Sequence, residues 1–329
     1  MTTPTPPKKH VLFIKFILTI YAIVLVMISV SNIGIFTPNW PLELFASYAR
    51  HLLILSPIIG LLFLFFWRAR LLFFVVVAAT AFWPLATFNK YENPTHAPCQ
   101  RENCLSLISV NLRGRPAALN RFIKSVRLSD YNIIGVYEIP EALSEYELRD
   151  LFPDFPHIFL VSQTLDGKIL GSVMAIISKH ELTNTAIIPT KIPGERFLPR
   201  AFISAEIEMS PGHKIQVFAG HPRLPLSKES MRQRDNLLGQ LNGKINDTQN
   251  FIIMGDFNLT PWTPVFRRLP GKRAGDPRHI YTWDAERPWL GIPIDHILVG
   301  SNIEVIEARV LAGIGSDHRP IMATIAFKE

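Results

Sequence analysis

The sequence predicts a layered α/β fold with mixed β-sheets, preceded by an apolar part that crosses a membrane. Long apolar stretches fill residues 1–89, and from Cys104 onward short β-rich runs are interspersed with helical patterns. Adjacent strand runs with helices around them are typical of sheets that are covered on their outer side. We therefore predict a membrane anchor over residues 1–89, a linker over 90–103 and a folded domain over 104–329.

Three apolar segments of residues 1–89 are candidates for transmembrane helices. Leu12 to Ile35 and Leu71 to Phe88 match the roughly 17 to 25 residues that a hydrocarbon core requires, and His51 to Trp67 lies at the short end of this range. A buried core helix explains the first segment poorly, because such a helix seldom stays apolar on every face. A cleavable signal peptide also explains this segment poorly, since its apolar region spans only about 7 to 15 residues.

Basic residues near the helix ends predict the orientation. Lys8, Lys9 and Lys15 precede or begin the first segment, and Arg68 and Arg70 lie between the second and third. Because Lys and Arg favour the cytoplasmic side, three crossings place the rest of the chain outside. A hairpin of the second and third segments gives the same result, whereas an even number of crossings reverses it.

The net charge of +7 gives little support to nucleic-acid binding. Six of the 34 basic residues and one of the 27 acidic residues precede Asn89, which leaves 28 basic against 26 acidic residues in the remainder. The excess of basic residues therefore lies mainly in the predicted membrane anchor, where basic residues set the topology.

The only two cysteines, Cys99 and Cys104, lie close together just after the apolar part. An oxidising compartment would allow them to form a disulfide, and two unrelated thiols are the alternative.

Short apolar runs bounded by Gly, Pro, Asn or Asp predict the strands of the folded domain. They are Leu105 to Val110, Ile133 to Val136, Val173 to Ser178, Phe202 to Ile207, Ile215 to Ala219, Phe251 to Met254, Ile294 to Val299 and Ala323 to Phe327. Helical periodicity predicts helices over Ala117 to Leu128, Glu141 to Leu151 and Lys228 to Ile245.

Eight polar residues lie at the end of an apolar run or within a residue or two of it. They are Asn111, Glu138, His221, Asp256, Asn258, Asp295, Asp317 and His318. Any one of them is explained by the preference of Asp and Asn for turns. Together, their carboxylates, amides and imidazoles supply the hard oxygen ligands of Mg²⁺ or Ca²⁺ and the acid–base groups that phosphate ester cleavage requires.

Seven short segments carry a resemblance to a known family. They are Ser109-Val110-Asn111-Leu112-Arg113, Tyr137-Glu138, Gly220-His221-Pro222, Gly255-Asp256-Phe257-Asn258, Tyr281-Thr282-Trp283, Ile294-Asp295-His296 and Ser316-Asp317-His318-Arg319-Pro320. In type and order they resemble the endonuclease/exonuclease/phosphatase superfamily, the fold of pancreatic deoxyribonuclease, neutral sphingomyelinases and inositol polyphosphate 5-phosphatases, and the bacterial membrane-anchored branch is the most similar group. The resemblance implies a four-layered α/β sandwich of two packed mixed β-sheets flanked by helices.

The resemblance also implies a set of cation ligands. Glu138 would be the principal carboxylate on a divalent cation, supported by Asn111 and, from the other side of the site, by Asp317. Mg²⁺ is the expected cation, with Mn²⁺ or Ca²⁺ as alternatives.

The catalytic roles carried over from the resemblance fall on five residues. Asp256 and Asn258 would position the attacking water and a phosphate oxygen, and Asp295 would orient His318. His221 would face the leaving oxygen as an acid or a hydrogen-bond donor. Which histidine is the acid and which the base stays open.

Departures from the family pattern qualify these roles. Tyr137 replaces the Gln that commonly precedes the metal-binding Glu, and Arg113 stands where DNA-repair members carry an additional acid. His296 is either a buried hydrogen-bonded histidine or a participant, and Thr282 and Trp283 are expected to pack the loop before Asp295.

The sequence and the resemblance together predict a divalent-metal-dependent hydrolase of phosphodiester bonds on the periplasmic side of a bacterial inner membrane. A nuclease-like activity is the first expectation, although the nearly balanced charge speaks against it. A lipid phosphodiesterase of the sphingomyelinase type is favoured by the bilayer anchor. A tethered, non-enzymatic scaffold with a vestigial site is the remaining alternative, and no protein partner is expected.

Overall fold

The chain forms two compact units, Met1–Asn89 with Trp262–Val265 and Lys90–Pro261 with Phe266–Glu329. A computed structural model describes residues 8–32, 40, 42–67, 90–96, 104–141, 143–161, 164–165, 168–169, 172–190, 200–210, 213–245, 249–277 and 281–328.

The first unit contains the helices α1 (Lys8–Asn32), α2 (Leu42–Ser47) and α3 (Ala49–Trp67). The two long helices contact each other, because Leu18, Ala22 and Leu25 of α1 are buried in a small apolar cluster with residues of α3. The Tyr21 hydroxyl of α1 also lies 2.9 Å from the Ser56 hydroxyl of α3.

The prediction of three transmembrane helices is wrong. Among the residues that the structure describes, no helix is long and apolar enough to cross a membrane. The predicted spans Leu12 to Ile35 and His51 to Trp67 coincide largely with α1 and α3, and the third, Leu71 to Phe88, lies outside the described residues. The sequence of an apolar segment does not reveal what the segment packs against. Part of the first predicted span packs against α3 in a helix–helix contact. The predicted multi-pass location in a bacterial inner membrane is withdrawn with it.

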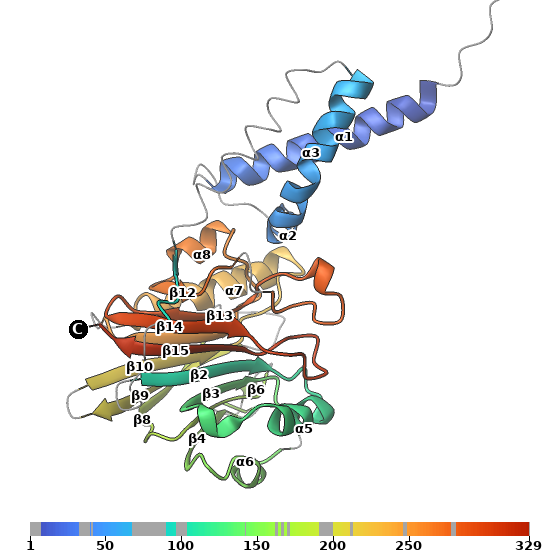
Figure 1. The fold of residues 1–329 in the computed structure, drawn as a ribbon. Coiled ribbons are helices and arrows are strands. Elements are labelled where there is room, and N and C mark those ends of the chain that lie inside the picture. Colours follow the sequence, from blue (N-terminus) through green and yellow to red (C-terminus); the bar gives the residue numbers. More distant parts are fainter. Residues whose placement is uncertain are drawn as a thin grey trace, which may run out of the picture. The chain divides into compact units, whose positions relative to one another are not determined.

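The second unit is built on two mixed β-sheets (Figure 1). The seven-stranded sheet has the order β1 (Tyr91–Glu92), β12 (Lys272–Ala274), β13 (Asp295–Val299), β11 (Phe251–Asp256), β10 (His213–Gly220), β9 (Ala201–Ser210) and β8 (Thr183–Pro189). The six-stranded sheet has the order β14 (Ile303–Val310), β15 (Ile321–Phe327), β2 (Cys104–Asn111), β3 (Ile133–Tyr137), β7 (Met174–Ser178) and β4 (His157–Val161). A hairpin, β5 (Thr164–Leu165) with β6 (Lys168–Ile169), stands apart.

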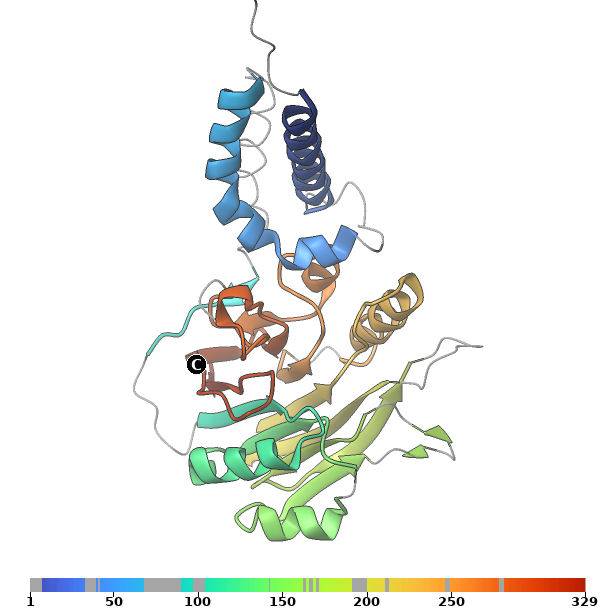
Figure 2. The ribbon, with the colours of Figure 1, turned by 90° about the vertical axis from the view of Figure 1, so that its right-hand side faces the viewer.

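Helices flank the two sheets (Figures 1 and 2). An apolar core with side chains from both sheets fills the space between them. A second apolar cluster joins the six-stranded sheet to α5 (Pro116–Ser125) and α6 (Glu145–Leu151). On the side of the seven-stranded sheet lie α7 (Lys228–Leu241) and the short α8 (Pro264–Arg268). Capping boxes begin α6 and α7, each stabilising its helix by about 1 kcal/mol.

The segment around the predicted linker carries two structural features. Tyr91–Glu92 forms β1, which pairs with β12 in parallel. Cys104 is disulfide-bonded. The only other cysteine of the sequence, Cys99, lies outside the described residues.

Candidate active site

Strands of both sheets end at one place and deliver polar side chains there. Asn111 is the last residue of β2, and Glu138 follows β3, its parallel neighbour. His221 follows β10, and Asp256 ends β11, which runs parallel to β10. Asp256 is paired in register with Asp295, the first residue of the antiparallel β13. The convergence expected of these five residues is therefore present.

A pair of glycines lets β10 and β11 approach closely beside the site. Gly220 and Gly255 are partners in register, one residue before His221 and Asp256. A Cβ atom built on Gly255 would lie 1.9 Å from the Gly220 carbonyl oxygen. Any side chain at position 255 would thus separate the two strand ends.

Asp256 is the buried centre of the site. Its Oδ2 accepts a hydrogen bond of 3.0 Å from Asn111 Nδ2 and lies 3.4 Å from His221 Nε2 and 3.6 Å from His318 Nε2. Its Oδ1 accepts from the Asn258 amide at 2.9 Å. Burial alone would raise the pKa of Asp256, but the charge of His318, the interaction with His221 and the hydrogen bond from the Asn258 backbone amide hold it below the ordinary range. Asp256 is therefore a carboxylate at neutral pH.

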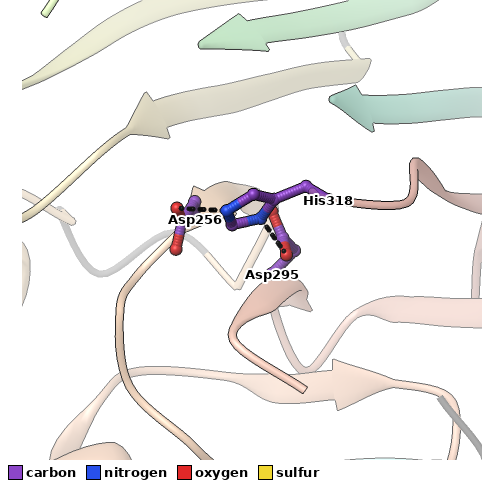
Figure 3. A group of neighbouring side chains, drawn as sticks. All are labelled: Asp256, Asp295 and His318. Carbon is purple, nitrogen blue, oxygen red and sulfur yellow. Dashed lines mark hydrogen bonds and ion pairs between the residues drawn. The ribbon is translucent and has the colours of Figure 1, made fainter. Parts of the chain in front are cut away.

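Asp295 holds His318, as expected, by a 2.9 Å contact between its Oδ2 and the ring Nδ1 (Figure 3). Burial would lower the pKa of His318, but the charges of Asp295 and Asp256 outweigh it and raise the pKa to about 10. The pKa of Asp295 is raised, first by burial and then by the charge of Asp256. The imidazole is thus a cation at neutral pH that lies between two carboxylates.

Arg200, which precedes β9, holds His221. The Arg200 Nη1 lies 3.1 Å from His221 Nδ1, with the Ser172 hydroxyl at 3.2 Å from the same nitrogen. A guanidinium can only donate, so Nδ1 accepts and the ring proton lies on Nε2. That nitrogen faces Glu138 Oε1 and Asp256 Oδ2, both at 3.4 Å. The sequence analysis missed Arg200, because a single Arg before a strand matches no motif.

Glu138 and Asn258 have left-handed backbone conformations, with φ of 48° and 49°. Such conformations are costly for residues other than glycine and concentrate at functional sites. The Glu138 side chain is 34% exposed and accepts from Asn111 Nδ2 at 3.3 Å. The Asn258 Nδ2 donates to the Pro222 carbonyl at 3.0 Å. Glu138 is therefore the carboxylate of the site most open to solvent, and Asn258 lies on the side of His221.

Asp317, predicted as a cation ligand, has different neighbours from the predicted catalytic residues. Its Oδ2 lies 3.2 Å from Arg113 Nη1 and accepts a hydrogen bond of 3.2 Å from Trp283 Nε1. Asp256, Asp295 and His318, by contrast, each offer a ligand atom within 4.8 Å of the others. Asp317 is thus ion-paired with the Arg113 guanidinium.

His296 is buried and fully hydrogen-bonded. Its Nδ1 accepts from Arg273 Nε at 2.9 Å, and its Nε2 donates to the Leu259 carbonyl at 2.7 Å. Burial, together with the charge of Arg273, lowers its pKa well below the ordinary value. Of the two interpretations of His296, the geometry favours the buried hydrogen-bonded histidine.

The donor set fits a divalent cation. Glu138 and Asp256 lie side by side, with Asn111 Nδ2 between them at 3.3 and 3.0 Å, and the Glu138 carboxylate is open to solvent. Carboxylate oxygens are the hard donors that Mg²⁺ and Ca²⁺ bind, whereas the protonated His318 ring offers no lone pair to an ion. Fold and site together define a metal-dependent phosphoesterase.

Comparison with known proteins identifies the family. Residues 108–318 match the model of the endonuclease/exonuclease/phosphatase family. The chain belongs to this family, and none of the described helices supports its membrane-anchored branch. No curated protein matches the chain in sequence.

Solved structures share the fold at low sequence identity. A protein of the same family from Bacteroides vulgatus has a TM-score of 0.57 at 17% identity, covering 68% of this chain and 99% of that one. The human Nocturnin catalytic domain with bound sulfate has 0.54 at 14%, covering 69% and 95%. ANGEL2, a 2′,3′-cyclic phosphatase in complex with adenosine-2′,3′-vanadate, has 0.52 at 15%, covering 69% and 96%.

Proposed function

We propose that this protein hydrolyses phosphodiester bonds with a divalent cation, Mg²⁺ in the first place, and acts as a nuclease. The observation that carries the proposal is the row Asp295, His318, Asp256, in which a buried imidazolium lies between two carboxylates beside the solvent-open Glu138. Structures of the same fold hold oxyanions, a sulfate in Nocturnin and an adenosine-2′,3′-vanadate in ANGEL2, which agrees with a phosphoryl site.

Glu138, with Asn111 and Asp256 beside it, would hold the cation. When bound, the cation supplies positive charge that neutralises the phosphoryl oxygens. The Glu138 carboxylate suits this role because it is the most exposed of the three acids. In this structure Asn111 presents its Nδ2 to both carboxylates and its Oδ1 to the Arg113 amide at 2.9 Å. Asn111 therefore orients the two acids.

The attack on phosphorus depends on Asp256 and Asn258. The lowered pKa of Asp256 keeps it ionised, so that it accepts a hydrogen bond from a water and orients the water's oxygen toward phosphorus. The Asn258 amide on Asp256 Oδ1 fixes the carboxylate at 2.9 Å. The same loop thus orients both the acid and the nearby Asn258 side chain.

The two site histidines are both donors, for different reasons. His318 is charged at neutral pH and presents Nε2–H to charge that develops on the phosphoryl group. Arg200 donates to His221 Nδ1, so the ring proton lies on Nε2, and this Nε2–H is available to the leaving oxygen. A donor fixed in advance in this way accelerates a reaction on the order of 10²-fold to 10³-fold.

The alternatives lose support. The lipid phosphodiesterase was favoured by a bilayer anchor, and no described helix spans a membrane. The scaffold with a vestigial site conflicts with family membership and with an intact Asp256, Asp295 and His318 group. Nucleic acid therefore remains the first substrate class to test.

The test is a substrate screen with the full chain. Hydrolysis of bis-p-nitrophenyl phosphate is measured with Mg²⁺, Mn²⁺ or EDTA, and we expect H318A to lose activity on the order of 10²-fold or more. The matched control is H213A, which removes an exposed histidine that contacts only the Phe327 ring among described aromatic residues. Plasmid DNA, RNA oligomers and phospholipid vesicles follow. Activity that persists in EDTA and in H318A would refute the hydrolase mechanism, and headgroup release with intact nucleic acid would refute the nuclease.

A further inference from the structure

Arg113 is built into the site by its backbone as well as its charge. It follows β2 by two residues and has a φ of 54°, and its amide donates to Asn111 Oδ1 at 2.9 Å. Asn111 in turn contacts Glu138 and Asp256. A left-handed backbone conformation is costly for Arg. The Asn111 side chain that accepts from the Arg113 backbone amide is the same one that donates to Glu138 and Asp256.

The Arg113 guanidinium and the Trp283 indole hold Asp317. Nη1 of Arg113 and Nε1 of Trp283 both lie 3.2 Å from Asp317 Oδ2. A cation on this oxygen, at the roughly 2.1 Å of a Mg²⁺–oxygen bond, would lie within about 5 Å of the guanidinium. Two positive charges at that distance repel each other, so the guanidinium and a divalent cation compete for Asp317.

Arg115 provides an internal comparison. It lies two residues further on and is exposed to a similar degree, at 41% against 44% for Arg113. Its Nη1 contacts Glu286 at 3.6 Å and the Gly315 carbonyl at 2.9 Å, and none of its described ion pairs involves Asp317. Arg113 Nη1 also lies 4.0 Å from Glu286. The two arginines therefore share Glu286 and differ in that only Arg113 contacts Asp317.

We infer that Arg113 is the counter-ion of Asp317, so that the protein binds one divalent cation, at Glu138, and Asp317 is not a ligand. The inference rests on the proposed metal-dependent function and specifies its metal stoichiometry. Glu138 is open to solvent beside Asn111 and Asp256, whereas Asp317 Oδ2 already takes the Arg113 guanidinium and the Trp283 indole. Arg113 thereby determines how many cations the site accepts.

The experiment titrates the metal-free full chain with Mn²⁺ and measures bound ions by electron paramagnetic resonance or calorimetry. We expect one Mn²⁺ per chain in the wild type. D317N should retain it with an affinity changed by less than about threefold, whereas E138Q should weaken it by about tenfold or more. R113E should bind a second Mn²⁺, and R113Q should bind the second ion more weakly.

R115E is the matched control, because it makes the same change of charge two residues away and should still bind one ion. Both arginines are partly exposed, so their ion pairs contribute little to stability, and thermal unfolding without metal verifies that each variant is folded. Two ions in the wild type, loss of the ion in D317N, or a second ion in R115E as well as R113E would overturn the inference and leave the proposed function standing. No bound ion in the wild type would instead refute the proposed function.

Discussion

Replacing His296 tests whether this residue supports the site or takes part in chemistry. In H296F a phenyl ring occupies the place of the imidazole between Phe257 and Phe266, whose ring centroids lie 5.3 and 4.7 Å away. The substitution leaves the Leu259 carbonyl without its donor and Arg273 Nε without its acceptor, in the fully buried surroundings of position 296.

Each buried polar group left without a partner costs roughly 1 to 3 kcal/mol, and more when it is charged. The two together should lower the free energy of unfolding by about 3 to 5 kcal/mol, a large part of the roughly 5 to 15 kcal/mol of a typical domain. R273M removes the unpaired guanidinium, so the double variant should be less destabilised than the sum of the two single variants, with a coupling of about 1 to 3 kcal/mol.

Urea unfolding followed by circular dichroism measures these free energies, and H213F is the control, expected within about 0.5 kcal/mol of the wild type since its histidine is exposed. If H296F is as stable as the wild type, or its effect adds simply to that of R273M, the described hydrogen-bond chain does not hold the loop after Asp256. If H296F is stable but inactive, His296 belongs to the chemistry.

Three further predictions concern the charges of the site. D295N should lower kcat on the order of 10²-fold. It should also move the pKa of His318 down from about 10, as measured by NMR titration of the metal-free protein. An unchanged pKa would contradict the ion pair between Asp295 and His318. Because the pKa of His318 is raised in the folded state, the stabilisation by its charge is complete below about pH 6.5 and should be lost as the pH rises through about 10. Thermal unfolding of wild type and D295N across this pH range should show the loss only in the wild type. R200M should lower kcat more than it raises KM, since His221 would lose the donor that fixes its proton on Nε2. R200K should restore part of the rate. Equal rates for R200M and wild type would exclude this role of Arg200.

The strands that carry the site could be predicted, because apolar runs that stop at a polar residue mark strand ends. All eight predicted strands and three predicted helices have counterparts in the structure, with bounds shifted by a few residues. Seven described strands were missed, namely β1, β4, β5, β6, β8, β12 and β14. β8 begins with four exposed residues, and β14 alternates with Glu304, Glu307 and Arg309, so neither has a continuous apolar run.

The contacts that decide the chemistry were beyond the sequence. Arg200 reaches His221 across 21 positions, and Arg113 reaches Asp317 across 204, so nothing local relates the members of either pair. Long-range contacts are also missing from the prediction of transmembrane helices in the N-terminal part, which relied on composition alone. The structure shows that some of these apolar residues pack between α1 and α3. The roles assigned to the individual site residues stay predictions until the variants are measured.

Three histidines near one another differ because of what faces their Nδ1 atoms. A carboxylate, Asp295, faces that nitrogen in His318 and makes the ring a cation, whereas a guanidinium donates to it in His221 and His296, so that the ring proton lies on Nε2. His221 and His296 differ in what faces Nε2: in His221 it is the solvent-open Glu138, and in His296 it is the buried Leu259 carbonyl. The same side chain thus supplies a fixed charge, an Nε2–H donor and a structural link. Exchanging a single partner, as in D295N or R200M, should convert one kind toward another without moving the strands that carry them.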